Sequence, residues 1–287
     1  MKVVLILYNV KAGHGKIARK IDKIGEAFRR GGYEPLMKLL RFGENPFTKV
    51  SGDIDLVVVC GGDGTINYVI NAMKSVGKNI PLGIIPAGTA NDFAGAIGMK
   101  SNPLKAVEQI INGKTRKLDC GRVNEQYFIN VLSFGLFTTT SQHTPDAIKH
   151  RIGKAAYLIE GAKELQRREY IPITIEHDHG TTQIDSLTTL IFNGRTAGRI
   201  RMARNAKIDD GLLDCVIIRR CCNIKIFWGL LCYLISGRTN SVIKHIRSTK
   251  LTISSELSPL TDMDGQTAPE LPLSIECIKE GLLVKCP

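Results

Sequence analysis

Short apolar strands and amphipathic helices alternate along the first 120 residues of the chain. Apolar runs typical of strands covered on both faces stand at residues 3–7, 56–60 and 81–86. Apolar residues at helical spacing follow these runs, over residues 17–28, 66–73 and 104–111. Gly31 and Gly32 mark the end of the first helix. Alternation of this kind predicts a parallel sheet with helices on both faces.

The pattern changes after about Gly121. Apolar and polar residues alternate with a period of two around residues 171–175, 251–253 and 273–275. This period indicates antiparallel strands with one solvated face, so we predict a second half that is mainly β. One helical insertion is expected over about 155–168. No repeat, low-complexity tract or Pro/Ser-rich linker separates the two halves, so two closely packed domains are expected.

The charge and composition narrow the possible partners. The 287 residues carry a formal net charge of +12, from 39 Lys and Arg against 27 Asp and Glu. This charge predicts a polyanionic partner, which can be nucleic acid, an anionic membrane or a phosphorylated small molecule. Aromatic residues make up only 6% of the chain and no motif that reads nucleic acid is present, so we expect no nucleic-acid partner.

Membrane and cysteine signals are weak. The apolar run at 3–7 is too short for a signal peptide, and the run at 227–235 is too short to span a bilayer. We interpret the latter as a buried helix, with a shallow membrane contact as the alternative. The eight cysteines show no CxxC and no zinc-ligand spacing, which predicts reduced, mostly buried thiols and a cytoplasmic protein.

The strongest chemical signal is the sequence Gly-Gly-Asp-Gly-Thr-Ile-Asn at 61–67, between an apolar strand and an amphipathic helix. Glycines let a backbone approach a phosphate, which amides and a helix N-terminus then stabilise. Asp63 would repel a polyphosphate unless it binds a metal, a water or a proton, which favours metal-assisted phosphoryl transfer. The alternative is an ordinary glycine-rich turn. Neither a P-loop nor a Rossmann fingerprint is present.

Two further polar loops follow the neighbouring strands. Residues 86–93 include Gly88, Thr89, Asn91 and Asp92, and residues 9–15 directly follow the first strand. Ligands of open α/β sheets bind at the carboxyl ends of the strands. Three such loops on three parallel strands therefore predict a nucleotide site.

These residues resemble the bacterial diacylglycerol kinase-like lipid kinases, relatives of the sphingosine and ceramide kinases. That family has an NPxxG-type loop, then GGDGTxN, then GTxND, and here the three stand in the same order at 9–13, 61–67 and 88–92. GGDG alone also occurs in NAD kinases and phosphofructokinase-like enzymes. Similarity continues at 118–135, at 206–214 and at 264–266, where the family has Asp-Gly-Glu, so nearly the whole chain is covered.

The resemblance implies a nucleotide-binding, phosphofructokinase-like α/β domain over 1–121 and a lipid-binding β-sandwich domain over 122–279, with a final strand at about 280–287 returning to the first. It implies ATP and Mg²⁺ as cofactors and a lipid hydroxyl as the acceptor of the γ-phosphoryl group. Residues implied in ATP contacts are Asn9, Val10, Lys11, Ala12, Gly13, Gly61, Gly62, Asp63, Gly64, Thr65, Asn67, Gly88, Thr89 and Asn91.

The resemblance also implies a metal network. Asp63, Asp92 and Asp210 would organise Mg²⁺ and water, with the Asp210 side chain as a ligand. Lys207 and Leu212 would contribute only backbone carbonyls. The alternative for Asp210-Gly211 is an ordinary hairpin turn, because Asp-Gly is common in such turns.

Gln266 is the largest departure from the family pattern. The family has its presumed general base, a glutamate, at this position, and an amide cannot accept the proton at neutral pH. Either the protein is a weak kinase or a lipid- or nucleotide-binding member without catalysis, or another carboxylate takes the role. Asp264 is the nearest candidate and Glu270 a second one. Val10 in place of proline and the lack of a threonine over 37–42 are smaller departures.

Basic segments suggest where the protein meets a membrane. Arg195, Arg199, Arg201, Arg204 and Lys207 lie within 13 residues that contain no acid, and residues 149–154 are a second candidate. These segments are either solvated surface or a rim for anionic headgroups. We expect a cytoplasmic protein with peripheral contact at the inner membrane face. NAD kinase is a less favoured alternative, and the oligomeric state stays open, a homodimer included.

Overall fold

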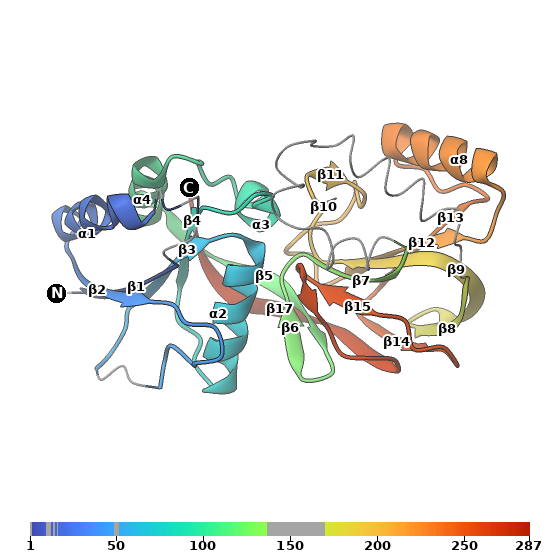
Figure 1. Ribbon diagram of the computed structural model, residues 1–287, viewed down its shortest axis with the longest axis horizontal. Helices are drawn as coiled ribbons and strands as arrows, with labels where there is room; N and C mark the ends of the chain where they lie inside the picture. The colour runs from blue at the N-terminus through green and yellow to red at the C-terminus, as the bar shows by residue number, and fades with distance from the viewer. Residues whose placement is uncertain (1, 10–12, 14, 16, 49–51, 137–169) are drawn as a thin grey trace. The chain divides into compact units, whose positions relative to one another are not determined.

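The computed structural model describes residues 2–9, 13, 15, 17–48, 52–136 and 170–287 (Figure 1). The chain divides into two compact units. Unit 1 comprises Met1–Cys120, Ile208–Asp210 and Ile278–Pro287, and unit 2 comprises Gly121–Lys207 and Gly211–Cys277. The helix expected over 155–168 and the basic segment at 149–154 lie outside the described residues.

Unit 1 is built on a sheet in the order β5-β17-β4-β3-β1-β2. The central strands are β1 (Lys2–Tyr8), β2 (Tyr33–Leu39), β3 (Leu56–Gly61) and β4 (Leu82–Pro86). These four are parallel to their neighbours, and every residue of β3 and β4 is buried, as the apolar runs predict. β5 (Lys114–Val123) and β17 (Leu273–Cys286) each begin in one unit and end in the other. β17 joins β4 in parallel at Val284 and Leu82.

The helices of unit 1 cover both faces of this sheet. They are η1 (Ala18–Lys20), α1 (Ile21–Arg30), α2 (Asp63–Ser75), α3 (Asp92–Ala96) and α4 (Pro103–Asn112). The crossovers β1-α1-β2 and β3-α2-β4 run in opposite directions along the sheet, so right-handed connections place α1 and α2 on opposite faces (Figure 1). The short α3 carries no clear periodic signal and is not predicted by the sequence, whereas η1 lies within the helix predicted over 17–28.

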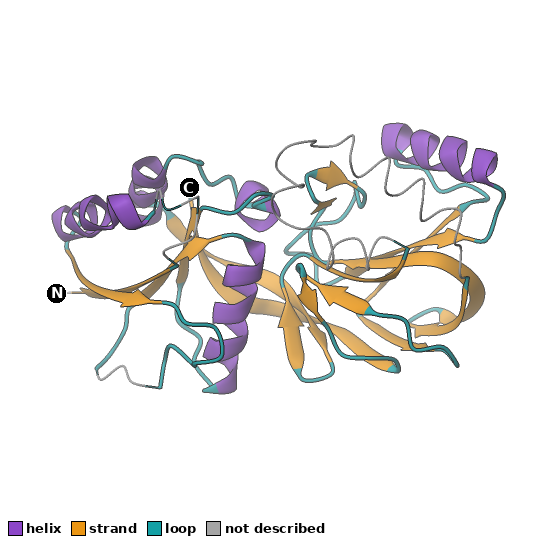
Figure 2. Ribbon diagram, viewed as in Figure 1, coloured by secondary structure: helices purple, strands orange, loops and turns teal. Residues whose placement is uncertain are grey.

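Unit 2 consists mainly of antiparallel strands (Figure 2). The strands are β6 (Gln126–Phe128), β7 (Val131–Gly135), β8 (Ile171–His177), β9 (Gly180–Phe192), β12 (Leu213–Arg219), β13 (Ile243–Ser248), β14 (Lys250–Ser254), β15 (Thr261–Met263) and β16 (Gln266–Thr267). A separate small ladder joins β10 (Thr196–Ala197) to β11 (Ile200–Arg201). The predicted fold class, a parallel α/β part followed by an antiparallel β part, is therefore confirmed.

The period-two pattern of the second half corresponds to buried and exposed faces of its strands. Ile253 pairs with Ile175 on one side and with Leu273 on the other, and all three are buried. Their polar neighbours along the strands are more exposed. The resulting cross-strand apolar rows form the core of unit 2.

Residues 227–235 form part of a helix, α8 (Asn223–Ser236), but the prediction that it is buried is only half right. Ile226 and Tyr233 are buried, whereas Phe227, Trp228 and other large apolar residues are exposed. Within the described residues, no helix combines the length and apolar character needed to cross a bilayer. Cysteine burial is also incomplete: all eight thiols are free, but only Cys60, Cys120, Cys215 and Cys286 are buried, and Cys222 and Cys232 are exposed.

The cross-strand pair of Gly121 and Phe128 generates a stability prediction. A Cβ at Gly121 would lie 2.0 Å from Cζ of the fully buried Phe128 ring. We therefore expect Gly121→Ala to lower the free energy of unfolding by about 1–3 kcal/mol, because the new methyl group must displace the ring. Gly95→Ala is the matched control, since a Cβ there meets no atom within 4 Å in α3. Urea unfolding followed by circular dichroism measures both, and equal stability of the two variants would contradict the prediction.

Candidate phosphate-binding site

Two of the glycine-rich loops touch through their backbones. A Cβ on Gly62 would lie 2.8 Å from Cα of Gly88, and a Cβ on Gly88 would lie 2.4 Å from Cα of Gly62. Distances below 3.0 Å to backbone atoms leave no room for a side chain at either position. Both positions therefore require glycine, and the contact holds the loops after β3 and β4 against each other.

The loop after β1 is tied to the same place by hydrogen bonds. The amide of Ala87 donates to the carbonyl of Gly61 at 2.9 Å, and the amide of Gly13 donates to the carbonyl of Ala87 at 2.8 Å. Ala87 thus links all three loops at the carboxyl edge of the sheet, a role that its side chain gave no reason to expect. Asn9 is half-buried at the end of β1, and Val10, Lys11 and Ala12 lie outside the described residues.

Asn91 closes the third loop on itself. Its side-chain Nδ2 donates to the carbonyl of Gly88 at 2.8 Å, and its Oδ1 accepts from the amide of Gly88 at 2.8 Å. The residue has a φ of +53°, in the left-handed region that asparagine tolerates. Asn91 therefore shapes the loop, while Gly88 and Thr89 are exposed at its tip.

The N-terminus of α2 supplies a concentration of backbone donors. Gly62 is its N-cap and has no side chain to cap the helix, and Gly62, Asp63, Gly64 and Thr65 are all partly exposed. A helix N-terminus of this kind attracts anions through its amides and dipole. Asn67 lies differently: it is buried, and Asn71 Nδ2 donates to its carbonyl at 3.0 Å and to its Oδ1 at 3.1 Å.

Asp63 joins the first turn of α2 to that of α3. Its Oδ2 accepts from the amide of Asp92 at 3.1 Å, and its Oδ1 accepts from the amide of Phe93 at 3.0 Å. Burial raises the pKa of the Asp63 carboxyl, although the two backbone hydrogen bonds oppose the shift. Asp92 is itself only 8% exposed. Two acidic side chains thus lie beside the glycine-rich loops, and one of them caps a neighbouring helix.

Asp210 belongs to a short segment that packs on β5 in unit 1. The amide of Asp119 donates to the carbonyl of Ile208 at 2.8 Å, and Arg116 forms an ion pair with Asp209 at 2.9 Å. Asp210 is partly exposed. Because β12 begins only at Leu213 and no strand directly precedes Asp210, the Asp210-Gly211 pair does not form a two-residue hairpin. Lys207 is exposed and Leu212 is half-buried; both belong to unit 2.

The donor set near these loops fits a nucleotide-bound Mg²⁺ better than a metal held by protein alone. Among the described residues, no three His, Cys, Asp or Glu side chains gather in a way that could hold a metal. Mg²⁺ in phosphoryl-transfer sites typically takes one or two carboxylates, with phosphate oxygens and water completing its shell. Asp63 and Asp92 lie together beside the loops and offer two carboxylates of this kind.

In unit 2, Asp264 holds the turn between β15 and β16. Asp264 and Gly265 have φ values of +52° and +85° and join the paired residues Met263 and Gln266, as in a type I′ hairpin. The Asp264 carboxylate accepts from three backbone amides: Ile129 at 2.7 Å, Asn130 at 3.0 Å and Val131 at 2.9 Å. These three bonds tie the turn to the backbone of residues 129–131.

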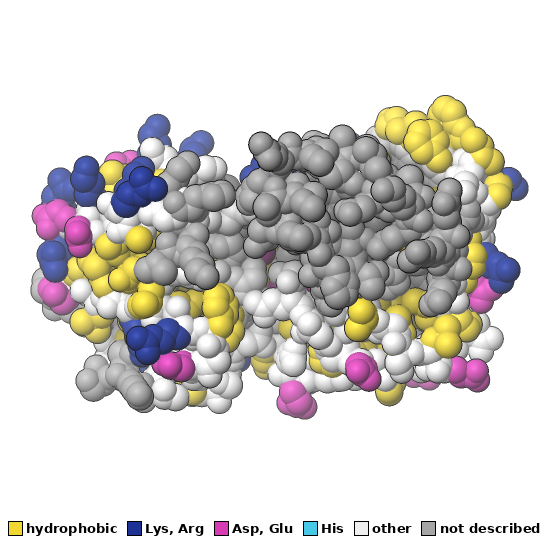
Figure 3. Space-filling view, in the orientation of Figure 1, with side chains coloured by type: hydrophobic (Ala, Val, Ile, Leu, Met, Phe, Trp, Pro, Cys, Tyr) yellow, Lys and Arg dark blue, Asp and Glu magenta, His cyan; other side chains and the backbone are white. Residues whose placement is uncertain are grey.

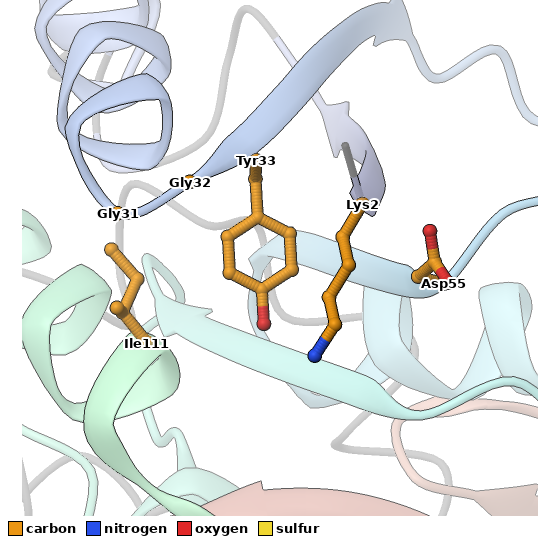
Figure 4. A pocket seen from close by; sticks show the side chains of 6 residues that line it. All are labelled: Lys2, Gly31, Gly32, Tyr33, Asp55 and Ile111. Carbon is orange, nitrogen blue, oxygen red and sulfur yellow. The ribbon is translucent and has the colours of Figure 1, made fainter.

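A hollow of about 620 Å³ lies elsewhere in unit 1 (Figure 4). It is lined by Lys2, Gly31, Gly32, Tyr33, Asp55 and Ile111. Lys2 and Tyr33 begin β1 and β2, and Asp55 directly precedes β3. The hollow therefore opens at the amino ends of the strands, away from the loops that follow their carboxyl ends.

Comparison with known proteins agrees with this architecture. Residues 3–123 match the diacylglycerol kinase catalytic domain, and residues 130–286 match the YegS C-terminal NAD kinase beta sandwich-like domain. The chain is similar to the diacylglycerol kinase of Staphylococcus epidermidis, at 28% identity over 98% of this chain and 91% of that protein. It is also similar to the diacylglycerol kinase of Bacillus subtilis strain 168, at 28% identity over 95% of this chain and 92% of that protein.

Solved structures show the same fold. A diacylglycerol kinase structure from Bacillus anthracis str. Sterne superposes with a TM-score of 0.82 over 100% of this chain and 97% of that chain, at 24% identity. The parallel unit with its glycine loops and the antiparallel β unit thus define the two-domain fold of this class of kinases. The chain belongs to the bacterial diacylglycerol kinase-like family.

The raised pKa of Asp63 predicts how stability depends on pH. Because the folded state favours the protonated carboxyl, the contribution of Asp63 to folding is fully present below about pH 4 and is lost as pH rises through the raised pKa. We expect the unfolding free energy of the wild type to fall relative to that of Asp63→Asn as pH rises from about 4 through the raised pKa. Denaturant unfolding of both proteins across this pH range measures the difference. A difference that is constant, or that changes in favour of the wild type, would contradict this.

Proposed function

We propose that this protein is an ATP- and Mg²⁺-dependent lipid kinase, which transfers the γ-phosphoryl group of ATP to a lipid hydroxyl, with diacylglycerol as the first candidate acceptor. The observation that carries the proposal is the backbone contact between Gly62 and Gly88 beside the N-terminus of α2. It leaves a surface of backbone groups, where a polyphosphate can approach closely. Membership of the diacylglycerol kinase-like family supports a lipid as the acceptor.

The glycine-rich loops and the nearby acidic residues have distinct roles in this proposal. The loops at 9–13, 61–67 and 88–91 bind the nucleotide, with Gly13, Gly62 and Gly88 allowing the backbone to approach it. Asp63 and Asp92 would orient water and metal beside the phosphates. Asp210 would give a side-chain oxygen to the metal, and the carbonyls of Lys207 and Leu212 would be further ligands. Bound Mg²⁺ would neutralise charge that develops on the transferred group.

Gln266 determines how fast such an enzyme can be. We assign Asp264 a structural role rather than that of a replacement base, because three backbone amides already bind its carboxylate. Phosphoryl transfer depends mainly on positioning and metal electrostatics, so a protein with glutamine at 266 keeps a basis for slow turnover. The alternative is a family member that binds nucleotide or lipid without catalysis.

The function is tested by transfer of radiolabelled γ-phosphate from ATP to diacylglycerol, monoacylglycerol, sphingosine or phosphatidylglycerol, with and without Mg²⁺. We expect label in one lipid, only with Mg²⁺. Gly88→Ala should reduce it about 10²-fold by displacing the loops, whereas Gly95→Ala should not. Nucleotide binding without label in any lipid would favour the non-catalytic alternative, and label in soluble NAD would favour an NAD kinase.

Gln266→Glu is expected to raise lipid kinase turnover. A general base typically contributes about 10²–10⁴-fold, so restoring a carboxylate should increase kcat by up to that range while leaving the affinity for ATP unchanged. Steady-state kinetics of the wild type and the variant measure this, with Gln266→Ala as the control for mere removal of the amide. An unchanged kcat would show that position 266 does not limit the reaction.

A further inference from the structure

We propose that the outer face of α8 is a membrane-docking surface that inserts into anionic phospholipid bilayers. Helix α8 is apolar on two sides, and Lys225 is its only charged residue. Ile226 and Tyr233 face the core of unit 2, whereas a second stripe at helical spacing faces outward. This outer stripe consists of Ile224, Phe227, Trp228, Leu231 and Ile235, which are 64%, 59%, 55%, 36% and 69% exposed.

Figure 3 shows hydrophobic side chains gathered over α8, with Lys and Arg side chains beside them. A helix that is apolar all round is normally buried on all sides or in contact with a membrane. Large apolar side chains that cluster on an exposed surface mark an interaction site rather than chance exposure. The outer stripe is therefore an interaction surface that another molecule or a membrane would cover.

The helix is fixed firmly enough to present this stripe. A Cβ on Gly229 would lie 2.8 Å from Cβ of Val242, so α8 packs directly against the residue that precedes β13. Asn240 Nδ2 donates to the carbonyl of Gly229 at 2.9 Å, and Arg204 donates to the carbonyls of Leu234 and Ile235 at the helix end. These contacts use the inner side and the C-terminus of α8 and leave the outer stripe exposed.

Charge identifies the occupant as an anionic bilayer. Residues 215–255 contain seven Lys or Arg and no Asp or Glu, and all seven basic residues are exposed. Three of the seven form ion pairs with acids outside this segment: Arg220 with Asp185, Arg247 with Asp214 and Lys250 with Glu276. The charge beside α8 therefore comes mainly from Arg219, Lys225 and Arg238. Arg219, Arg220 and Lys225 stand just before and within the first turn of α8, and Arg238 follows its end. Trp, Phe, Leu and Ile on one side of a helix, with basic residues beside it, are typical of helices that lie in the membrane interface.

This inference rests on the proposed function in one respect, since a lipid acceptor resides in the membrane to which α8 would attach. It also moves the membrane contact away from the segment at 195–207. There, Arg195 donates to the carbonyl of Ala206 at 2.6 Å and Arg204 binds the end of α8, so both arginines have structural partners.

Trp228 makes the proposal testable without an activity assay, because it is the only tryptophan of the chain. The full-length protein is mixed with vesicles of equal parts phosphatidylcholine and phosphatidylglycerol, or of phosphatidylcholine alone, in the absence of ATP. We expect a blue shift of tryptophan emission and flotation with the anionic vesicles, both weakened by salt. An unchanged emission spectrum, whether or not the protein floats, would overturn the proposal.

Variants separate the helix from the rest of the surface. Ile224→Ser combined with Ile235→Ser keeps the Phe227–Trp228 pair and should weaken vesicle affinity at least about tenfold. Leu260→Ser, at a residue 49% exposed outside α8, is the control and should bind as the wild type does. Equal vesicle binding by the α8 variant and the wild type would overturn the proposal. The proposal would also be overturned if the wild type formed a dimer that does not bind vesicles and if the α8 variant were monomeric.

Kinase activity is measured separately on lipid dispersed in detergent micelles. We expect the α8 variant to retain activity there and to lose it on vesicles. If no lipid is phosphorylated in micelles while the emission shift and flotation persist, the proposed function fails and the docking surface stands.

Discussion

The contact between the backbones of Gly62 and Gly88 is the constraint on which the arrangement of the glycine-rich loops depends. Two backbone segments can approach this closely only where both residues lack a Cβ. Here the approach occurs just after the ends of two adjacent parallel strands, β3 and β4. Ala87 then connects the pair to Gly13 through main-chain hydrogen bonds. The surface offered to a ligand is therefore mostly backbone, and its shape is determined by the sheet beneath it.

Carboxylates in the Gly-Gly-Asp-Gly and Asp-Gly-Gln motifs have roles in the fold. Asp63 caps the first turn of α3, and Asp264 collects three amides around a tight turn. In both cases the carboxylate accepts hydrogen bonds from backbone amides of a neighbouring segment. This explains why residue type alone could not separate a reactive aspartate from a structural one in this chain.

Much of the fold could be predicted from the sequence, because the apolar runs of β1, β3 and β4 and the alternation around Ile175, Ile253 and Leu273 reflect burial directly. That the three loops lie at one edge of the sheet could also be predicted, because each follows the carboxyl end of a parallel strand. The rest depends on contacts between residues far apart in the chain. The linkage through Ala87, the amides around Asp264 and the exposed side of α8 are such features, and none leaves a local pattern. For α8 the sequence pattern was ambiguous, because an apolar run looks the same whether its side chains are buried in the protein or exposed on its surface.

The course of β17 has a consequence for how the protein is made. Ile278–Pro287 belongs to unit 1, where Val284 pairs with Leu82 of β4 and the Lys74 ammonium donates to the carbonyl of Gly281. A ribosome synthesises these residues only after all of unit 2 has been made. The nascent chain therefore carries an incomplete parallel sheet, with the edge of β4 unpaired by β17, throughout most of its synthesis. The parallel sheet of unit 1, which begins with the first strand of the chain, is therefore completed only by the last strand to be made.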